Sequence, residues 1–225
     1  MTKLRVLLSW SSGKDSAWCL RLLRQNPDIE VAALLTTFNA SAGRVAMHAV
    51  RRELVAMQAA RAELPLWPVE LPWPCSNEIY ENLMASACRR ALDDGIAAIA
   101  FGDLFLRDIR AYRERQLAPF GLQPIFPVWD IPTSVLAREM IRAGLRARIT
   151  CVDPAKLDAS FAGRDFDDAF LRDLPPGADP CGENGEFHSF VWDAPVFNAP
   201  IPIEDGEIIE RDGFVFADIG PRATA

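Results

Sequence analysis

The chain has 225 residues, half of them hydrophobic, and a net charge of −7 with a pI near 4.9. This composition excludes a disordered chain and argues against general binding to nucleic-acid backbones, which favours a basic face. No apolar run approaches the roughly 20 residues of a membrane span, and the apolar stretch after Met1 is too short for a signal peptide. We therefore expect a cytoplasmic protein that binds no membrane. The five cysteines form no Cys-x-x-Cys pair, which argues against a structural zinc site.

Strand-like and helix-like segments alternate through the first two thirds of the chain. Continuous apolar runs predict five buried strands, at residues 4–8, 31–36, 66–71, 96–101 and 124–127. Helical spacing of apolar residues predicts helices between them, at about residues 16–25, 46–63, 77–94 and 107–117. This alternation predicts an α/β fold with a doubly wound, parallel sheet of five strands. The strand order that we expect for it, 3-2-1-4-5, is the one implied by the family resemblance described below.

The pattern changes from about Trp129 onward. A helix over 132–144 and a strand over 147–152 are followed by a stretch rich in Pro, Gly and Asp that reaches residue 186. The tail predicts a hairpin, residues 206–210 against 214–218. We interpret the chain as a nucleotide-binding domain over residues 1–128 and a smaller C-terminal α+β lobe over 129–225, packed over the crevice of the sheet.

The first motif lies between the first predicted strand and helix. It consists of Ser11, Ser12, Gly13, Lys14, Asp15 and Ser16. Small residues at a helix N-terminus let backbone N–H groups point at a phosphate, and Lys14 adds a positive charge. The pattern is not a Walker loop, because Leu8 stands where that loop has its first glycine. A polar turn with Asp15 or Ser16 as the helix N-cap remains the alternative.

Gly102 and Asp103 follow the predicted fourth strand. In the order 3-2-1-4-5, strands one and four are neighbours at the point where the sheet reverses direction. Ligands bind there, outside the carboxyl ends of the strands. The 11–16 loop and Gly102-Asp103 are therefore expected to face one crevice.

The second motif places Glu183, Glu186 and His188 close together in a glycine-rich stretch, residues 179–189. If the chain is extended from Glu186, then Glu186 and His188 share one face of the strand. A carboxylate beside an imidazole suits binding Mg²⁺, holding an ammonium or transferring a proton. A turn with solvated acids and a satisfied histidine is the alternative.

The 11–16 loop resembles the pyrophosphate loop (PP-loop) of the N-type ATP pyrophosphatases, with Ser12 in place of the usual first glycine. As a whole, the chain resembles the ATP-binding diphthine–ammonia ligase (diphthamide synthase) family of the adenine-nucleotide α-hydrolase-like superfamily. The segments that carry the resemblance are residues 11–16, 44–48 with Gln58, 101–103, 182–189 and 193–197. Residues 104–114 look more like those of bacterial relatives. Since bacteria make no diphthamide, the acceptor stays open.

The resemblance implies an ATP-dependent ligase in which a carboxylate attacks the α-phosphate of ATP, pyrophosphate leaves, and ammonia converts the adenylate to an amide and AMP. It implies that the 11–16 loop with Gly102 and Asp103 binds ATP, and that Asp15 or Asp103 holds Mg²⁺. The implied catalytic residues are Lys14, Asp15, Glu183, Glu186 and His188. Glu183 and Glu186 would neutralise an ammonium or anchor a cationic group of the acceptor.

Three alternatives remain at this point. One keeps the ATP chemistry with a small-molecule carboxylate as the acceptor, and another is a nucleotide-binding sensor without turnover. Sulfur transfer through Cys181 is the third, although the chain shows no partner cysteine for it. His48 is expected in the adenine or acceptor pocket, or in the core. The superfamily implies a homodimer.

Overall fold

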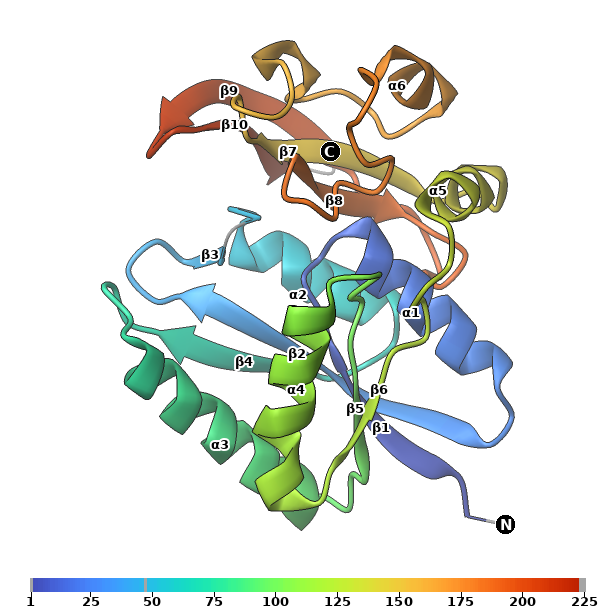
Figure 1. The fold of residues 1–225 in the computed structure, drawn as a ribbon, viewed down its shortest axis with the longest axis vertical. Helices are drawn as coiled ribbons and strands as arrows, with labels where there is room; N and C mark the ends of the chain where they lie inside the picture. The colour runs from blue at the N-terminus through green and yellow to red at the C-terminus, as the bar shows by residue number, and fades with distance from the viewer. Residues whose placement is uncertain (1, 47, 223–225) are drawn as a thin grey trace.

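The computed structural model describes residues 2–46 and 48–222. Two sheets lie one above the other, with the N-terminal part of the chain forming the lower sheet and the C-terminal part the upper one (Figure 1). Within the described ranges, none of the helices combines the length and the apolar character that crossing a membrane requires.

The lower sheet has six strands, whose bounds are β1 (Leu4–Ser9), β2 (Ile29–Asn39), β3 (Arg44–Val45), β4 (Leu66–Leu71), β5 (Ala98–Ala100) and β6 (Gln123–Ile125). Five of them are parallel and run in the order β4-β2-β1-β5-β6, which confirms the predicted order and fold class. The sequence did not predict β3, a two-residue strand antiparallel to the end of β2. It occupies the side of β2 that becomes free where β1 ends.

Four helices accompany this sheet, namely α1 (Lys14–Gln25), α2 (Arg52–Arg61), α3 (Asn77–Asp93) and α4 (Arg107–Leu117), with a short 3-10 turn at Ala118–Phe120. The helix predicted from residue 46 is wrong in its first turn and a half, because residues 44–51 form a closed turn and α2 begins only at Arg52. Side chains alternate across the central strand, so that Val6 and Leu8 join one core and Leu7 the other.

The upper sheet is antiparallel, in the order β8-β7-β10-β9. Its elements are α5 (Thr133–Arg142), β7 (Arg146–Val152), a 3-10 turn (Ala159–Phe161), α6 (Asp168–Asp173), β8 (Phe187–Asp193), β9 (Ile203–Arg211) and β10 (Phe214–Pro221). The predicted C-terminal hairpin is confirmed and is longer than expected. One hydrophobic core runs from Trp10 and Leu20 of the lower part to Phe187 and Phe190 of the upper part, so the two sheets pack directly on each other.

Candidate active site

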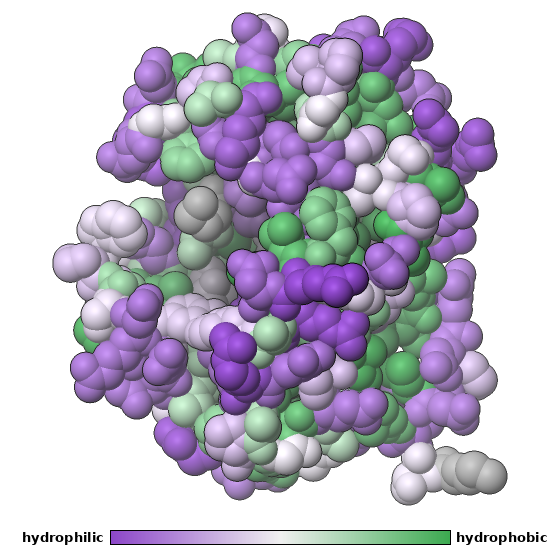
Figure 2. Space-filling view, in the orientation of Figure 1, coloured by the Kyte–Doolittle hydropathy of each residue, from purple (hydrophilic) through white to green (hydrophobic). Residues whose placement is uncertain are grey.

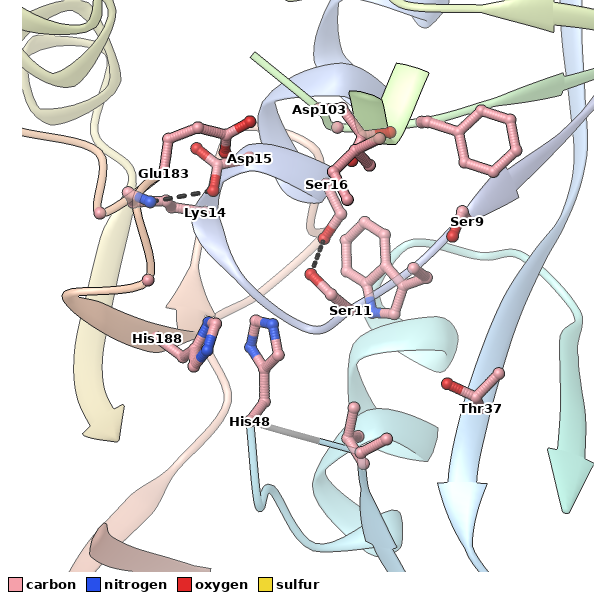
Figure 3. A pocket seen from close by; sticks show the side chains of 18 of the residues that line it. Ser9, Ser11, Lys14, Asp15, Ser16, Thr37, His48, Asp103, Glu183 and His188 are labelled. Carbon is pink, nitrogen blue, oxygen red and sulfur yellow. Dashed lines mark hydrogen bonds and ion pairs between the residues drawn. The ribbon is translucent and has the colours of Figure 1, made fainter. Parts of the chain in front are cut away.

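A cavity of about 560 Å³ opens where the carboxyl ends of β1 and β5 meet the loop that precedes β8. The space-filling view shows the surface hollowed between the parts formed by the two sheets (Figure 2). Both sequence motifs reach the cavity from opposite sides (Figure 3). The predicted site residues that line it are Ser11, Lys14, Asp15, Ser16, Gly102, Asp103, Glu183 and His188. Ser12, Gly13 and Glu186 do not line it.

The PP-loop passes directly from β1 into α1. Gly13 is the N-cap of α1, so the alternative of an Asp15 or Ser16 cap is wrong; the Lys14 N–H at the start of the helix donates to the Ser189 hydroxyl at 3.3 Å. The Ser16 hydroxyl donates to the Gly13 carbonyl at 2.9 Å and lies 3.3 Å from the Ser11 hydroxyl. Beyond the Lys14 N–H, the first turn of α1 has N–H groups without an intrahelical acceptor and two hydroxyls at the edge of the cavity, an arrangement that suits an anion.

Lys14 is buried and connects the two motifs. Its Nζ lies 2.9 Å from the Asp15 carboxylate, donates to the Cys181 carbonyl, and sits 5.2 Å from the centre of the Phe187 ring. Burial alone would lower the pKa of Lys14, but Asp15 and Glu183 among its neighbours raise it overall, so the side chain is charged. Lys14 thus reaches across the cavity toward the second motif.

Two carboxylates of the cavity have buried oxygen atoms that accept no hydrogen bond from the described residues, Oδ1 of Asp15 and Oδ2 of Asp103, although the latter is ion-paired with Arg113. Burial raises the pKa of both groups, and the charge of Asp15 adds to the rise at Asp103. Arg113, whose Nε is 3.6 Å from Asp103, opposes that rise. Carboxylate oxygens without a hydrogen-bond donor fit a divalent cation. Within residues 2–46 and 48–222, no three His, Cys, Asp or Glu side chains lie close enough together to hold a metal ion. A cation at Asp15 and Asp103 would therefore also need oxygen atoms of a bound substrate.

Glu183 points into the cavity and accepts a hydrogen bond from the Leu104 N–H at 2.8 Å. Burial raises its pKa to about 7, against the opposing effect of that hydrogen bond. The preceding turn depends on Gly182, which has φ +72° and whose Cβ, if present, would lie 2.8 Å from the Phe187 carbonyl oxygen. Only glycine fits there, and this turn is what directs Glu183 inward.

Glu186 does not line the cavity, and its side chain forms hydrogen bonds within the 179–189 loop. It is buried, and its Oε1 accepts hydrogen bonds from the Asp179 N–H at 2.9 Å and from the Asn184 amide at 3.2 Å. Strand β8 begins one residue later, at Phe187. Although the sequence predicted that Glu186 and His188 share a strand face, only His188 lines the cavity.

The two histidines of the chain face each other in the cavity, with ring centroids 4.5 Å apart. Burial, together with the charges of Lys14 and Lys156, lowers the pKa of His188 to about 4. Burial also lowers the pKa of His48 well below its usual value. Nδ1 of His48 lies 3.2 Å from the Ser189 carbonyl oxygen. Both rings are therefore neutral near pH 7.

Gln58 is a structural link that the sequence marked only as part of the resemblance. It is fully buried, accepts from the Trp10 indole N–H at 2.8 Å, and donates to the carbonyls of Ser12 at 3.0 Å and Val191 at 2.7 Å. It thereby fixes the PP-loop to β8. Arg113 and Tyr80 line the cavity as well, and nothing in the local sequence identified them.

Comparison with known proteins agrees with this geometry. Residues 132–220 match the family model described as the diphthamide synthase C-terminal domain. The chain is 31% identical to the human diphthine–ammonia ligase over 150 residues, 64% of this chain and 56% of that protein. It is 32% identical to the zebrafish (Danio rerio) diphthine–ammonia ligase over 136 residues, 56% and 51% of the two chains. The chain thus spans about half the length of the curated relatives it matches.

Among solved structures, the chain is similar to the U34-tRNA thiolase NcsA from Methanococcus maripaludis with its [4Fe-4S] cluster. The TM-score is 0.40 at 16% identity, covering 60% of this chain and 56% of that one. So distant a likeness carries no argument. The family model and the named relatives support the resemblance that the motifs predict: the chain is similar to the diphthine–ammonia ligases, and its residues 132–220 are similar to the diphthamide synthase C-terminal domain.

Proposed function

We propose that the chain is an ATP-dependent ligase that adenylates a carboxylate, with release of pyrophosphate, and then amidates it with ammonia. The observation that carries this proposal is the meeting of the two motifs in one cavity at the carboxyl ends of β1 and β5. A cavity of this size suits a nucleotide-sized ligand. The similarity to diphthine–ammonia ligases supports the same reaction. The division into domains 1–128 and 129–225, the cytoplasmic location and the homodimer belong to this proposal as expectations.

In the first step, a substrate carboxylate oxygen bonds to the α-phosphorus of ATP and the bond to the β-phosphate oxygen breaks. The N–H groups of α1 that lack an intrahelical acceptor, with Ser11 and Ser16, would hold the phosphates, and Lys14 would offset the charge that grows on them. Asp15 and Asp103 would hold Mg²⁺ through the carboxylate oxygens that accept no hydrogen bond, with Arg113 beside Asp103. When bound, this ion neutralises phosphate charge.

In the second step, ammonia attacks the acyl carbon and AMP leaves with the electron pair of the broken C–O bond. Glu183 is the acid placed to face the incoming nitrogen, because its carboxylate projects into the cavity. With a pKa of about 7, it is half ionised near neutral pH and stabilises an ammonium when charged. We assign Glu186 a different role from the one its sequence motif suggests, which is to hold the 179–184 loop so that Glu183 points inward.

Sulfur transfer is disfavoured by the state of Cys181. Its thiol is buried and close to the Thr133 carbonyl, and burial raises its pKa well above the usual range. A thiol that stays protonated is a poor nucleophile and a poor persulfide carrier.

The test is AMP and pyrophosphate production from Mg-ATP, with and without ammonium, for the wild type, Lys14→Met and the control Lys3→Met, which changes an exposed lysine. We expect AMP formation that falls at least about 100-fold in Lys14→Met, the usual loss when one group that stabilises developing charge is removed. ATP binding without turnover in the wild type would favour the nucleotide-binding alternative. ADP in place of AMP would show that the PP-loop interpretation is wrong.

A further inference from the structure

Residues 44–51 form a loop whose two ends touch each other, and we call it the His48 loop. Arg44 and Arg51 form an antiparallel bridge at its neck. Just inside the neck, the Val45 N–H donates to the Val50 carbonyl at 2.9 Å. The chain therefore leaves the sheet at β3 and returns to the same place before α2, with His48 near the far end of the loop.

One carboxylate from the other sheet holds this neck. Asp218 of β10 accepts from Arg44 Nη1 at 2.7 Å through Oδ1 and from Arg51 Nη2 at 2.6 Å through Oδ2. Burial tends to raise the pKa of Asp218, but its hydrogen bonds to Arg51 and Arg44 outweigh that effect and lower it to about 2. Two guanidinium groups so close together repel each other unless an anion lies between them. Asp218 is that anion.

The His48 loop is also a wall of the cavity, which Val45, Ala46 and His48 line. The His48 ring packs tightly on the PP-loop, since a Cβ on Gly13 would lie 3.0 Å from its Cε1. On its other side it faces His188 (Figure 3). The position of His48 against the PP-loop thus depends on a loop that is fastened to a strand of the other sheet.

The contact of His48 with Ser189 selects one form of the imidazole. A backbone carbonyl oxygen only accepts hydrogen bonds, so the Nδ1 that lies 3.2 Å from it must carry the proton. The ring is neutral, which leaves Nε2 with a free lone pair. Within the described part of the chain, no group donates a hydrogen bond to that nitrogen. His48 therefore offers the cavity a hydrogen-bond acceptor.

We propose that Asp218 is a positioning residue for the cavity: by clamping the neck of the His48 loop, it holds His48 in the Nδ1–H form with Nε2 open to an N–H donor of the ligand, an ammonium or amine nitrogen. The identity of the donor rests on the proposed function, whereas the clamp does not. In the amidation step, the nitrogen gains a positive charge as its bond to the acyl carbon forms. Nε2 takes one of its protons, AMP leaves with the electron pair of the C–O bond, and the proton passes to solvent.

The clamp of Asp218 with Arg44 and Arg51 lies outside the hydrophobic core. Asp218 is absent from the lining of the main cavity and borders a separate one of about 390 Å³, open between the hairpin and the loop. The side chain of Arg51 is 42% exposed and that of Asp218 is 19% exposed. Ion pairs this close to water contribute little to stability. Loss of the clamp should therefore change the position of His48 more than the stability of the fold.

The experiment is nitrogen NMR of the two imidazole rings in ¹⁵N-histidine-labelled full-length protein at pH 7. With only two histidines, His188→Asn assigns the signals. We expect the Nδ1–H form for His48 in the wild type, and in Asp218→Asn a shift to the Nε2–H form that free imidazoles prefer. Asp218→Glu, which keeps the charge, should restore most of the wild-type signal.

Asp205→Asn is the matched control. Asp205 lies on the neighbouring strand β9 and is paired with Arg148 at 3.2 Å, but has no link to the His48 loop. It should leave the His48 signal unchanged. If Asp218→Asn unfolds, Arg51→Gln should give a partial shift, because Arg44 and Asp218 remain paired. A wild-type Nδ1–H signal that survives in both variants would overturn the clamp.

A titration with ammonium chloride against potassium chloride, at equal ionic strength, tests the donor. We expect ammonium, and not potassium, to move the His48 Nε2 resonance, and no difference would overturn the assigned donor class. None of these readouts needs turnover. A protein that forms no AMP but shows the Nδ1–H form of His48 would therefore refute the proposed function and leave the clamp standing. A protein that forms AMP but keeps the Nδ1–H signal in both clamp variants would refute the clamp and leave the proposed function standing.

Discussion

The two walls of the cavity are built in different ways. The PP-loop wall is contiguous in the chain, and its shape follows from the passage of β1 into α1, with Gly13 as the cap. The opposite wall combines the 179–189 loop with the His48 loop, which meet where His48 contacts Ser189, 141 residues further along the chain, and which a few polar contacts hold in place. The first wall is therefore shaped mainly by local backbone geometry, with Gln58 linking it to β8, whereas the second depends throughout on a few buried or long-range side chains.

This difference between the walls predicts that single substitutions at a few positions of the second wall strongly lower the free energy of unfolding. The largest expected effect is at Gly182, where alanine would combine a left-handed backbone with a contact of 2.8 Å to the Phe187 carbonyl oxygen. Each of these costs about 1–3 kcal/mol, so Gly182→Ala should lower the free energy of unfolding by about 3 kcal/mol or more. Urea denaturation followed by circular dichroism measures this change.

Gly177→Ala is the matched control for that prediction. Gly177 has φ +97° in the same part of the chain, but a Cβ there meets nothing within 4 Å. It should therefore show the backbone cost alone, about 1 kcal/mol. If Gly182→Ala and Gly177→Ala lower the free energy of unfolding equally, the turn at Gly182 can relax to make room for a Cβ, and the second wall does not depend on that glycine.

The second prediction concerns pH and isolates Glu183. Its folded pKa of about 7 lies above the ordinary 4.5, so between these pH values the folded chain keeps a proton that the unfolded chain has released. The unfolding free energy from this group therefore falls as pH rises from about 4.5 to about 7 and stays level above. The total fall is about 2 kcal/mol, less than the full pKa shift would give because the carboxylate is partly exposed.

Glu183→Gln separates this effect from other titrations. The amide oxygen can still accept the Leu104 N–H, but the side chain no longer ionises. Urea denaturation of both proteins at several pH values should show the wild type losing stability relative to the variant between pH 4.5 and 7. The two histidines have lowered pKa values, so their contribution to the free energy of unfolding falls as the pH falls, opposite to that of Glu183. This contribution is the same in both proteins and cancels when the variant is subtracted from the wild type. A constant difference would contradict the burial of Glu183 in the second wall.

The same contrast explains what the sequence could predict. The parallel strands, the hairpin and the loop between β1 and α1 follow from patterns within a few residues, and they agree with the structure, whereas the strand order came with the family resemblance. The orientation of Glu186 was wrongly expected, because strand alternation holds only from Phe187 onward and the turn before it rotates the carboxylate under the loop. The role of Gln58 and the clamp at Asp218 depend on contacts between distant segments, which no local pattern reveals.

The smallest expected effect is in the first wall, at Ser12. This residue has φ +71°, the conformation in which the PP-loop pattern has glycine, and its buried hydroxyl has no partner among the described residues. Glycine removes both the backbone strain and the unpaired hydroxyl but gains entropy in the unfolded chain, so Ser12→Gly should stabilise the protein by about 1 kcal/mol. Ser12→Ala removes only the hydroxyl and should give the smaller part of that gain in the same urea experiment. If alanine stabilises as much as glycine, the strain in the loop is negligible, and the first wall owes its shape to packing as the second one does.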